Sequence, residues 1–545
     1  MRDDATVMTP ELALTPSGAA GEGSLQRQID WTGAFWVASG VPALVLFSIG
    51  AIAATVGKPS WLVWTISIGF GFLQAFTYAE IAGLFPDKTG GASVYGAIAW
   101  VRYSKLIAPI SVWCNWFAWA PVLAIGSGLA AGYILSVLFP ADAAINTWQL
   151  TLLDLGWLKE GLTLRINATF IIGTVLLLMV YAIQNKGILN AARTQMILSL
   201  SALLPLLLVG IVPLLSGDLP REHFAPLLPI AHDSAGAVID GTWNMAGITL
   251  MAGGLFIAAW STYGFETAVC YTREFKDPKT DTFKAIFYSG LLCVFAYTLI
   301  PLAFQGALGL EGMLAEDIYS GMGVGKAMVG MVGGGYVLEN ILVVMLVLAV
   351  VLSIMTTMSG AARTLYQASV DGWLPKYLSH ANAHGAPTSA MWTTLAFNLV
   401  LLMMSDYVFV LAISNVGYLI FNFLNLNAGW IHRLDRPHWE RPFRAPTWLI
   451  VIGAVLSFVN LTLLGMGANI WGAGTLISGL LFAALIIPIF AYRHYIVDKG
   501  RFPEEMVSDL HLSDRGVVNG AGIWPYVTLV AAAIVVFVAN RIAVY

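Results

Sequence analysis

The sequence contains few charged residues and few cysteines, and its apolar runs contain no histidine. Asp, Glu, Lys and Arg together make up 11 % of its 545 residues, against about 25 % in a typical soluble domain. The three cysteines have no disulfide or metal-ligand spacing. All eight histidines lie outside the apolar runs, so an intramembrane haem or histidine metal site is unsupported. No basic patch with interleaved aromatics suggests nucleic acid. We therefore predict neither a cofactor nor a nucleic-acid partner.

Apolar residues, in contrast, make up 58 % of the chain and occur in long runs. About 20 such residues suffice to cross a bilayer as a helix, and the sequence contains enough of them for a multi-pass membrane protein. Residues 1–30 are polar and lack a basic segment followed by a short apolar run, so we expect no removable signal peptide. Thirteen membrane spans are predicted, at 33–56, 60–83, 107–137, 166–183, 190–215, 247–271, 285–307, 338–359, 389–405, 408–430, 447–467, 471–491 and 522–541.

The distribution of Lys and Arg agrees with these spans. With a cytoplasmic N-terminus, 21 of the 27 Lys and Arg residues fall in the segments predicted to be inside. The other six are Lys58, Lys159, Arg165, Arg221, Lys326 and Arg541. Cytoplasmic loops are enriched in Lys and Arg, so the sequence predicts a cell-membrane protein with a cytoplasmic N-terminus.

Two of the predicted spans contain residues that interrupt helices. The first span carries Ala38-Ser39-Gly40-Val41-Pro42, and proline removes a helix hydrogen bond while glycine eases the break. The sixth carries Ser261-Thr262-Tyr263-Gly264, followed by the acid Glu266. Glycine and proline often merely kink membrane helices. Breaks five spans apart, however, are typical of transporters with inverted repeats and a substrate at the midplane.

Further motifs lie before and after these breaks. In chain order the stretches are Ser39-Gly40-Val41; Glu80 through Pro86 with Gly90-Gly91 and Tyr95; Trp260 through Ala268; Glu274 through Lys279; and Ser359 through Arg363 with Asp371 through Pro375. Together they resemble the amino acid–polyamine–organocation (APC) superfamily of permeases, from about residue 33 to residue 495. Ala38 replaces the first glycine of that family's glycine-serine-glycine break.

The resemblance implies an all-α membrane protein built from two five-helix inverted repeats with broken helices 1 and 6. The repeats would cover 31–215 and 216–432, after a polar cytoplasmic tail at 1–30. Peripheral spans 11 and 12 would occupy 433–495. Residues 496–545 would hold a cytoplasmic linker and a thirteenth span, which departs from the usual twelve.

The resemblance also implies a substrate site at the two breaks. A half-helix N-terminus suits a carboxylate, and the family places the substrate carboxylate at the positions of Ser39, Gly40 and Val41. Gly40 is expected to leave its backbone open to the ligand. The amino group would face the sixth-span break, at Trp260, Ser261, Thr262 and Gly264. Trp260 is a candidate aromatic gate or cation–π partner, with ordinary helix packing as the alternative.

Glu266 matches an acid that proton-linked members use for coupling or gating. Burial favours the uncharged form of a carboxyl group, so Glu266 is the candidate for proton coupling; a structural hydrogen-bonding role is the alternative. Sodium coupling is the alternative, because the eighth predicted span contains hydroxyl groups that could bind the ion, at Ser353, Thr356 and Thr357. The sequence thus predicts a permease for amino acids or small amines, coupled to protons or working by exchange. The predicted pocket contains no second acid that could pair with a cationic side chain of a substrate. This favours neutral or acidic amino acids, or small amines, as substrates. A membrane-embedded transferase is the alternative of another class.

Overall fold

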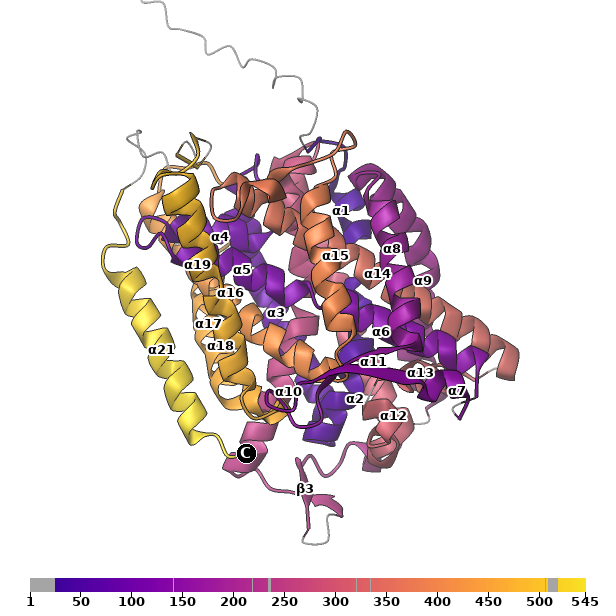
Figure 1. The fold of residues 1–545 in the computed structure, drawn as a ribbon. Coiled ribbons are helices and arrows are strands. Elements are labelled where there is room, and N and C mark those ends of the chain that lie inside the picture. Colours follow the sequence, from indigo (N-terminus) through magenta and orange to yellow (C-terminus); the bar gives the residue numbers. More distant parts are fainter. Residues whose placement is uncertain are drawn as a thin grey trace, which may run out of the picture.

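The computed structural model describes residues 25–140, 142–217, 219–233, 237–319, 321–333, 335–504, 506–507 and 518–545. Most of the predicted tail 1–30 and part of the linker in 496–545 lie outside these residues. Helices run side by side and form a bundle, and two short β-hairpins lie at one end of it (Figure 1). Because lipid offers no hydrogen bonds to the backbone, helices that satisfy their own backbone groups are the expected structure.

The first part of the bundle contains a helix that is interrupted near its middle. Its two halves are α1 and α2, separated by the short 3-10 helix η1. A hairpin of β1 and β2 leads into α8, and its second strand touches the end of α15 through a hydrogen bond from Arg165 N to Met403 O. The elements are α1 (Trp31–Ala38), η1 (Val41–Leu44), α2 (Val45–Val56), α3 (Ser60–Gly83), α4 (Ala92–Trp100), α5 (Ile107–Trp119), α6 (Val122–Leu138), α7 (Ala144–Thr147), β1 (Gln149–Asp154), β2 (Thr163–Asn167), α8 (Ala168–Gln184) and α9 (Ile188–Ser216).

The second part repeats the interruption, because α10 changes into the 3-10 helix η3 at the position of the sixth predicted span. The long helix α11 is broken at Gly309, whose φ of +66° is favoured by glycine. The elements are η2 (Arg221–His223), β3 (Ile230–His232), β4 (Val238–Asp240), α10 (Met245–Thr262), η3 (Gly264–Glu274), α11 (Pro278–Met313), α12 (Glu316–Tyr319), α13 (Val324–Val332), α14 (Gly335–Val370), η4 (Lys376–Ser379), α15 (Thr388–Leu402) and α16 (Tyr407–Asp435).

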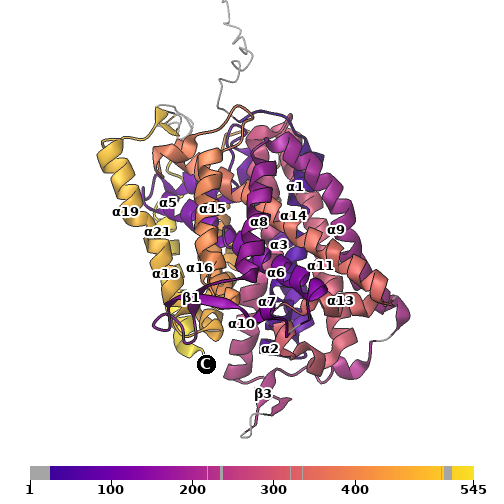
Figure 2. The same ribbon diagram turned by 45° about the vertical axis from the view of Figure 1, so that its right-hand side comes forward.

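The remaining helices lie at one edge of the bundle (Figure 2). The elements are α17 (Thr447–Gly467), η5 (Ala468–Trp471), α18 (Thr475–Ala484), α19 (Ile486–Ala491), the π-helix η6 (Tyr492–Val497) and α21 (Trp524–Ile542). Helix α21 packs closely on α17: a Cβ added to Gly465 would lie 2.6 Å from Val536 O and 2.7 Å from Ala539 Cβ. The side-chain amide of Asn540 also donates to Gly465 O at 3.1 Å. Glycine is therefore needed for this contact.

The predicted spans coincide with helices of the structure. Among the described residues, 11 helical segments are long and apolar enough to cross a membrane. The fourth and ninth predicted spans correspond to the shorter apolar helices α8 and α15, of 17 and 15 residues. At about 1.5 Å per residue these two are shorter than a hydrocarbon core of about 30 Å. The membrane-spanning character of most of the chain is thus clear, while the total of thirteen spans stays a prediction.

Contacts between loops show that the segments predicted to be inside share one face of the bundle, which we call the basic face. The seven segments are joined in a chain of hydrogen bonds and ion pairs: Arg27 with Asp87, Gln28 N with Glu274 O, Lys88 with Asp371, Asn382 with Asn185 O, Lys279 with Glu440, and Lys376 with Asp498. The C-terminus lies at the opposite end, near β3 (Figure 1).

This arrangement predicts the accessibility of two positions. Arg444 lies on the basic face, next to Ala445, whose backbone N–H donates to Glu80 at 2.8 Å. Tyr545 follows α21 and lies at the opposite face. In intact cells, an impermeant thiol reagent should therefore modify only one of the single variants Arg444→Cys and Tyr545→Cys. The native cysteines are buried and should not react with the reagent. Equal labelling of both positions in sealed cells would contradict the placement of α21 across the bundle.

Candidate substrate and coupling site

The first helix break is held open by contacts with two other helices. After α1 the chain turns at Ser39 and Gly40 and continues as η1, where Pro42 cannot donate a backbone hydrogen bond. The Ser39 hydroxyl lies 2.6 Å from the hydroxyl of Ser199 on α9. A Cβ added to Gly40 would lie 2.5 Å from Leu352 O and 2.6 Å from Ser353 N on α14. The space that a side chain at Gly40 would occupy is therefore filled by the backbone of α14, while the exposure of the Gly40 backbone to a ligand stays a prediction.

The second break lies beside the first. Helix α10 ends at Thr262, and from Gly264 the backbone continues in the tighter 3-10 winding of η3 rather than as an open loop. A Cβ added to Gly264 would lie 2.8 Å from Trp119 and 3.0 Å from the Val41 side chain. Here the missing side chain does face the space between the two breaks.

Tyr297 of α11 joins the two breaks. Its hydroxyl lies 2.6 Å from Val41 O and 2.9 Å from Ser261 O, so it can donate to the carbonyl of either interrupted helix. Its ring stacks on Trp64, with ring centroids 5.6 Å apart and planes 6° apart. Tyr297 was not among the predicted site residues, although a tyrosine inside an apolar span is, like Glu266, a polar group at membrane depth.

A narrow pocket lies where the breaks meet, and in this structure it has no room for a water molecule; we call it the cavity. Its floor and walls combine backbone of both breaks with hydroxyl groups of α14, and its lining contains no acidic or basic side chain. The lining residues are Gly40, Val41, Leu44, Trp119, Gly264, Thr267, Ser353, Thr356 and Thr357. Three of the predicted site residues, Gly40, Val41 and Gly264, are thus brought together around one space.

The other four predicted substrate-site residues lie next to the cavity but do not line it. Ser39 points to α9, as described above. Ser261 donates to Leu44 O at 3.3 Å, and the Thr262 hydroxyl is 2.7 Å from Ser67. Trp260 is fully buried, donates from its indole to Ala118 O at 2.8 Å, and packs on Trp119 with centroids 6.0 Å apart. The structure therefore favours packing roles for these side chains in this conformation.

Hydroxyl and amide groups satisfy the carbonyls at the end of α1. Ser353 donates to Gly40 O at 2.6 Å, and Thr356 donates to Val37 O at 2.5 Å. The side-chain amide of Gln195, on α9, donates to Val37 O at 3.2 Å and to the Thr356 hydroxyl at 3.3 Å. Since a carbonyl can only accept, the NH₂ end of this amide must face Val37. Ser353 and Thr356, two of the three hydroxyls named for a sodium site, thus already have protein partners, and sodium binding there stays a prediction.

Glu266 is an isolated acid in the interior. It is 1 % exposed, and its Oε1 accepts a hydrogen bond from the indole of Trp119 at 3.1 Å. Its Oε2 is buried without a hydrogen-bond partner among the described residues. No Lys or Arg within the described parts of the chain forms an ion pair with it. A buried charge normally requires such a partner, so this environment disfavours the carboxylate and suits a group that holds a proton.

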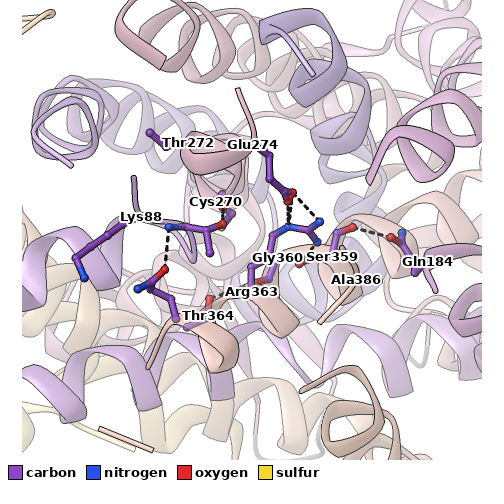
Figure 3. A network of polar contacts seen from close by, with 12 residues as sticks. Lys88, Gln184, Cys270, Thr272, Glu274, Ser359, Gly360, Arg363, Thr364 and Ala386 are labelled. Carbon is purple, nitrogen blue, oxygen red and sulfur yellow. Dashed lines mark hydrogen bonds and ion pairs between the residues drawn. The ribbon is translucent and has the colours of Figure 1, made fainter. Parts of the chain in front are cut away.

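Between the cavity and the basic face, η3 is fixed to α14 by a buried ion pair (Figure 3). The Arg363 guanidinium binds both carboxylate oxygens of Glu274, with hydrogen bonds of 2.6, 2.8 and 3.1 Å, and the two side chains are 4 % and 1 % exposed. Arg363 also donates to Ser359 O and lies over the ring of Tyr271. The Ser359 hydroxyl in turn donates to Gln184 of α8 at 2.8 Å. This network connects three helices on one side of the cavity.

The loop after α3 closes the same region from the other side. Lys88 and Asp371 form a second buried ion pair at 2.5 Å. The hydroxyl of Thr89 donates to Cys270 O at 2.5 Å, and Thr364 donates to Gly90 O at 2.8 Å. The residues that fill the space between cavity and basic face are therefore tied together by ion pairs and hydrogen bonds, and the cavity is closed on this side.

Breaking the Glu274–Arg363 pair on one side should destabilise the protein strongly. Removing one partner of a buried pair leaves an uncompensated charge and costs about 3 to 5 kcal/mol, so Glu274→Gln should lower the free energy of unfolding by about that amount. Denaturant and thermal unfolding of the purified protein measure the loss. Glu440→Gln, which breaks the exposed pair with Lys279, is the matched control and should change stability little. Equal effects of the two substitutions would contradict the assignment.

Comparison with known proteins agrees with this geometry. Residues 29–491 match the model of the amino acid permease family. The polyamine transporter PUT1 of Oryza sativa subsp. japonica is 24 % identical over 80 % of this chain and 75 % of its own, and the branched-chain amino acid permease BcaP of Bacillus subtilis is 23 % identical over 83 % and 90 %. A putative arginine/ornithine antiporter of Escherichia coli is 24 % identical over 70 % and 76 %. These relatives are transporters rather than enzymes, and the chain belongs to the amino acid permease family of the APC superfamily.

Proposed function

We propose that this permease moves small neutral amino acids or amines across the cell membrane by alternating access, with proton symport or substrate exchange as the driving process. The observation that carries the proposal is the cavity between the two helix breaks, which is lined by backbone, hydroxyl and aromatic groups. Exposed backbone at broken helices suits the charged ends of such a solute. Gly40 and Val41 would face the carboxylate, and Gly264 the amino group.

The absence of charge in the cavity lining supports a neutral side chain on the substrate. The relatives named above differ in this respect, since their names specify polyamines, branched-chain amino acids, and arginine with ornithine. A cationic side chain would need an acidic partner in a dry site. The lining offers none, and the nearby acid Glu266 already accepts a hydrogen bond from Trp119.

The hydrogen bonding of α1 and α14 supports protons over sodium. A sodium ion would take its ligands from the oxygen atoms of Val37, Gly40, Ser353 and Thr356. In the structure both hydroxyls and the Gln195 amide donate to the carbonyls, so these oxygens already have partners. Gln195 would have to turn away before a cation could bind. Sodium symport is the second candidate, because the same oxygens form a plausible cation site once Gln195 leaves.

The proposed orientation places the basic face in the cytoplasm, since it carries the segments rich in Lys and Arg. The two inverted repeats would be 31–215 and 216–432, with the helix breaks at corresponding positions. Two buried ion pairs, Glu274–Arg363 (Figure 3) and Lys88–Asp371, hold together the elements between the cavity and the basic face. Opening to the cytoplasm would require η3 and α14 to separate there.

Proteoliposomes containing the purified protein would test the proposal. Labelled neutral amino acids and small amines should enter by counterflow and accumulate under an inward proton gradient. Arginine and polyamines should be poor substrates, and replacement of sodium by choline should leave uptake unchanged. Uptake that requires sodium and ignores pH would favour the second candidate; absence of counterflow for every amino acid and amine would contradict the proposal itself.

Glu266→Gln tests proton coupling directly. Glutamine keeps the volume and the hydrogen bonding of a protonated carboxyl group but cannot titrate. Accumulation driven by a pH gradient should fall to the exchange background, while counterflow survives because exchange needs no net proton movement. The same substitution at Glu160, an exposed loop residue, is the matched control and should leave both processes unchanged. If Glu266→Gln keeps full proton-driven accumulation, the coupling group is another residue and Glu266 is structural.

A further inference from the structure

A groove of about 870 Å³ lies on the basic face, apart from the transport cavity. It forms between the end of α14, the short helix η4 and the chain that follows α19. Most of its polar groups are cationic, and two serines add hydroxyls. The residues that matter are Lys376, Arg493, Lys499 and Arg501, with Ser369 and Ser379.

The cations of this groove exceed its acids. Its single acid, Asp498, lies 2.5 Å from Arg493 and 3.1 Å from Lys376. Burial alone would raise the pKa of Asp498, but the hydrogen bonds from these two cations lower it overall, so the carboxylate stays ionised. Lys499 and Arg501 are exposed and form no ion pair with any residue that the structure describes. The groove therefore has a net positive charge carried by two side chains that are available to a ligand.

The backbone presents these two cations in an unusual way. Helix α19 ends in the π-helical turn η6, and π-turns occur often at functional sites. Lys499 follows with a φ of +53°, in the left-handed region that non-glycine residues seldom adopt. Such a conformation costs free energy and commonly marks a site where a side chain must be aimed.

The groove opens at the level expected for lipid headgroups. Tyr492, Tyr495 and Ile496 of η6 are 56 %, 63 % and 66 % exposed. Exposed tyrosines at the end of a membrane helix are typical of the interface between hydrocarbon and water. A molecule held by Lys499 and Arg501 would therefore have its polar part in the groove and its acyl chains beside these side chains.

We propose that the groove binds the phosphate of an anionic phospholipid headgroup. Basic clusters at the cytoplasmic end of membrane helices attract anionic lipids, and arginine and lysine are the side chains that bind phosphate best. The bound lipid would connect α14, which also lines the transport cavity, to η6 and the chain that follows it. Free phosphate shares the same binding chemistry, and the adjoining apolar surface is what favours the lipid.

The test compares the full chain in nanodiscs of phosphatidylcholine with increasing phosphatidylglycerol, using native mass spectrometry to count retained lipid. One basic residue near an anionic surface contributes a factor of roughly five in affinity. Lys499→Gln combined with Arg501→Gln should therefore weaken phosphatidylglycerol binding about 25-fold. Lys499→Arg combined with Arg501→Lys keeps the charge and should retain binding. Lys276→Gln combined with Arg444→Gln removes two exposed charges elsewhere on the same face and is the matched control.

Unchanged phosphatidylglycerol binding by the Lys499→Gln, Arg501→Gln variant would overturn the proposal, as would an equal loss in the control variant. The substituted residues are exposed, and a monodisperse peak in size-exclusion chromatography confirms folding. Inorganic phosphate added to phosphatidylcholine nanodiscs forms the second arm. A thermal stabilisation by phosphate that matches the effect of phosphatidylglycerol would overturn the lipid assignment in favour of a soluble anion, whereas stabilisation by the lipid alone supports it.

Discussion

The requirement that every backbone carbonyl inside a membrane find a donor governs the centre of this protein. Interrupting α1 and α10 frees carbonyls that helices would otherwise satisfy. Ser353 and Thr356 donate to those at the end of α1, and Tyr297 lies within reach of both breaks. Packing of α14 and α11 therefore stabilises the breaks that glycine and proline permit. Since these donors are hydroxyls, which can rotate and exchange partners, a polar solute could replace some of these bonds without leaving groups unsatisfied.

The 3-10 helix η3 links the cavity to the basic face. It begins at Gly264 beside the cavity and ends at Glu274 in the ion pair with Arg363. At about 2 Å per residue, its 11 residues span roughly 20 Å. A displacement at one end of so short and densely packed an element must be felt at the other, because buried side chains cannot shift independently. The proposed substrate contact at Gly264 and the ion pair of Glu274 thus lie at the two ends of one short helix, which connects them mechanically.

Most of the architecture could be predicted from the sequence because its determinants are local. Apolar runs locate the helices, glycine and proline locate both breaks, and alternating Lys and Arg content identifies the loops that share one face. The directions of side chains could not be predicted in this way. Ser39 meets Ser199, 160 positions away, and Gln195 and Tyr297 matter only through contacts with distant helices. The packing around Gly40 could not be predicted either, because the space beside its Cα is filled by the backbone of the distant helix α14.

Glu266 and Glu274 lie on the same short helix, and their partners alone distinguish them. Glu274 has a bidentate arginine, so its charge is compensated and its removal affects stability. Glu266 has one indole donor and one oxygen without a partner among the described residues, so a negative charge there would be poorly compensated. Protonation is the simplest way to relieve that cost, and only a conformation that brings water or a cation to Glu266 would favour release of the proton. Alternating access supplies such a change of environment, which is why the unpaired acid, rather than the paired one, is the proposed coupling group.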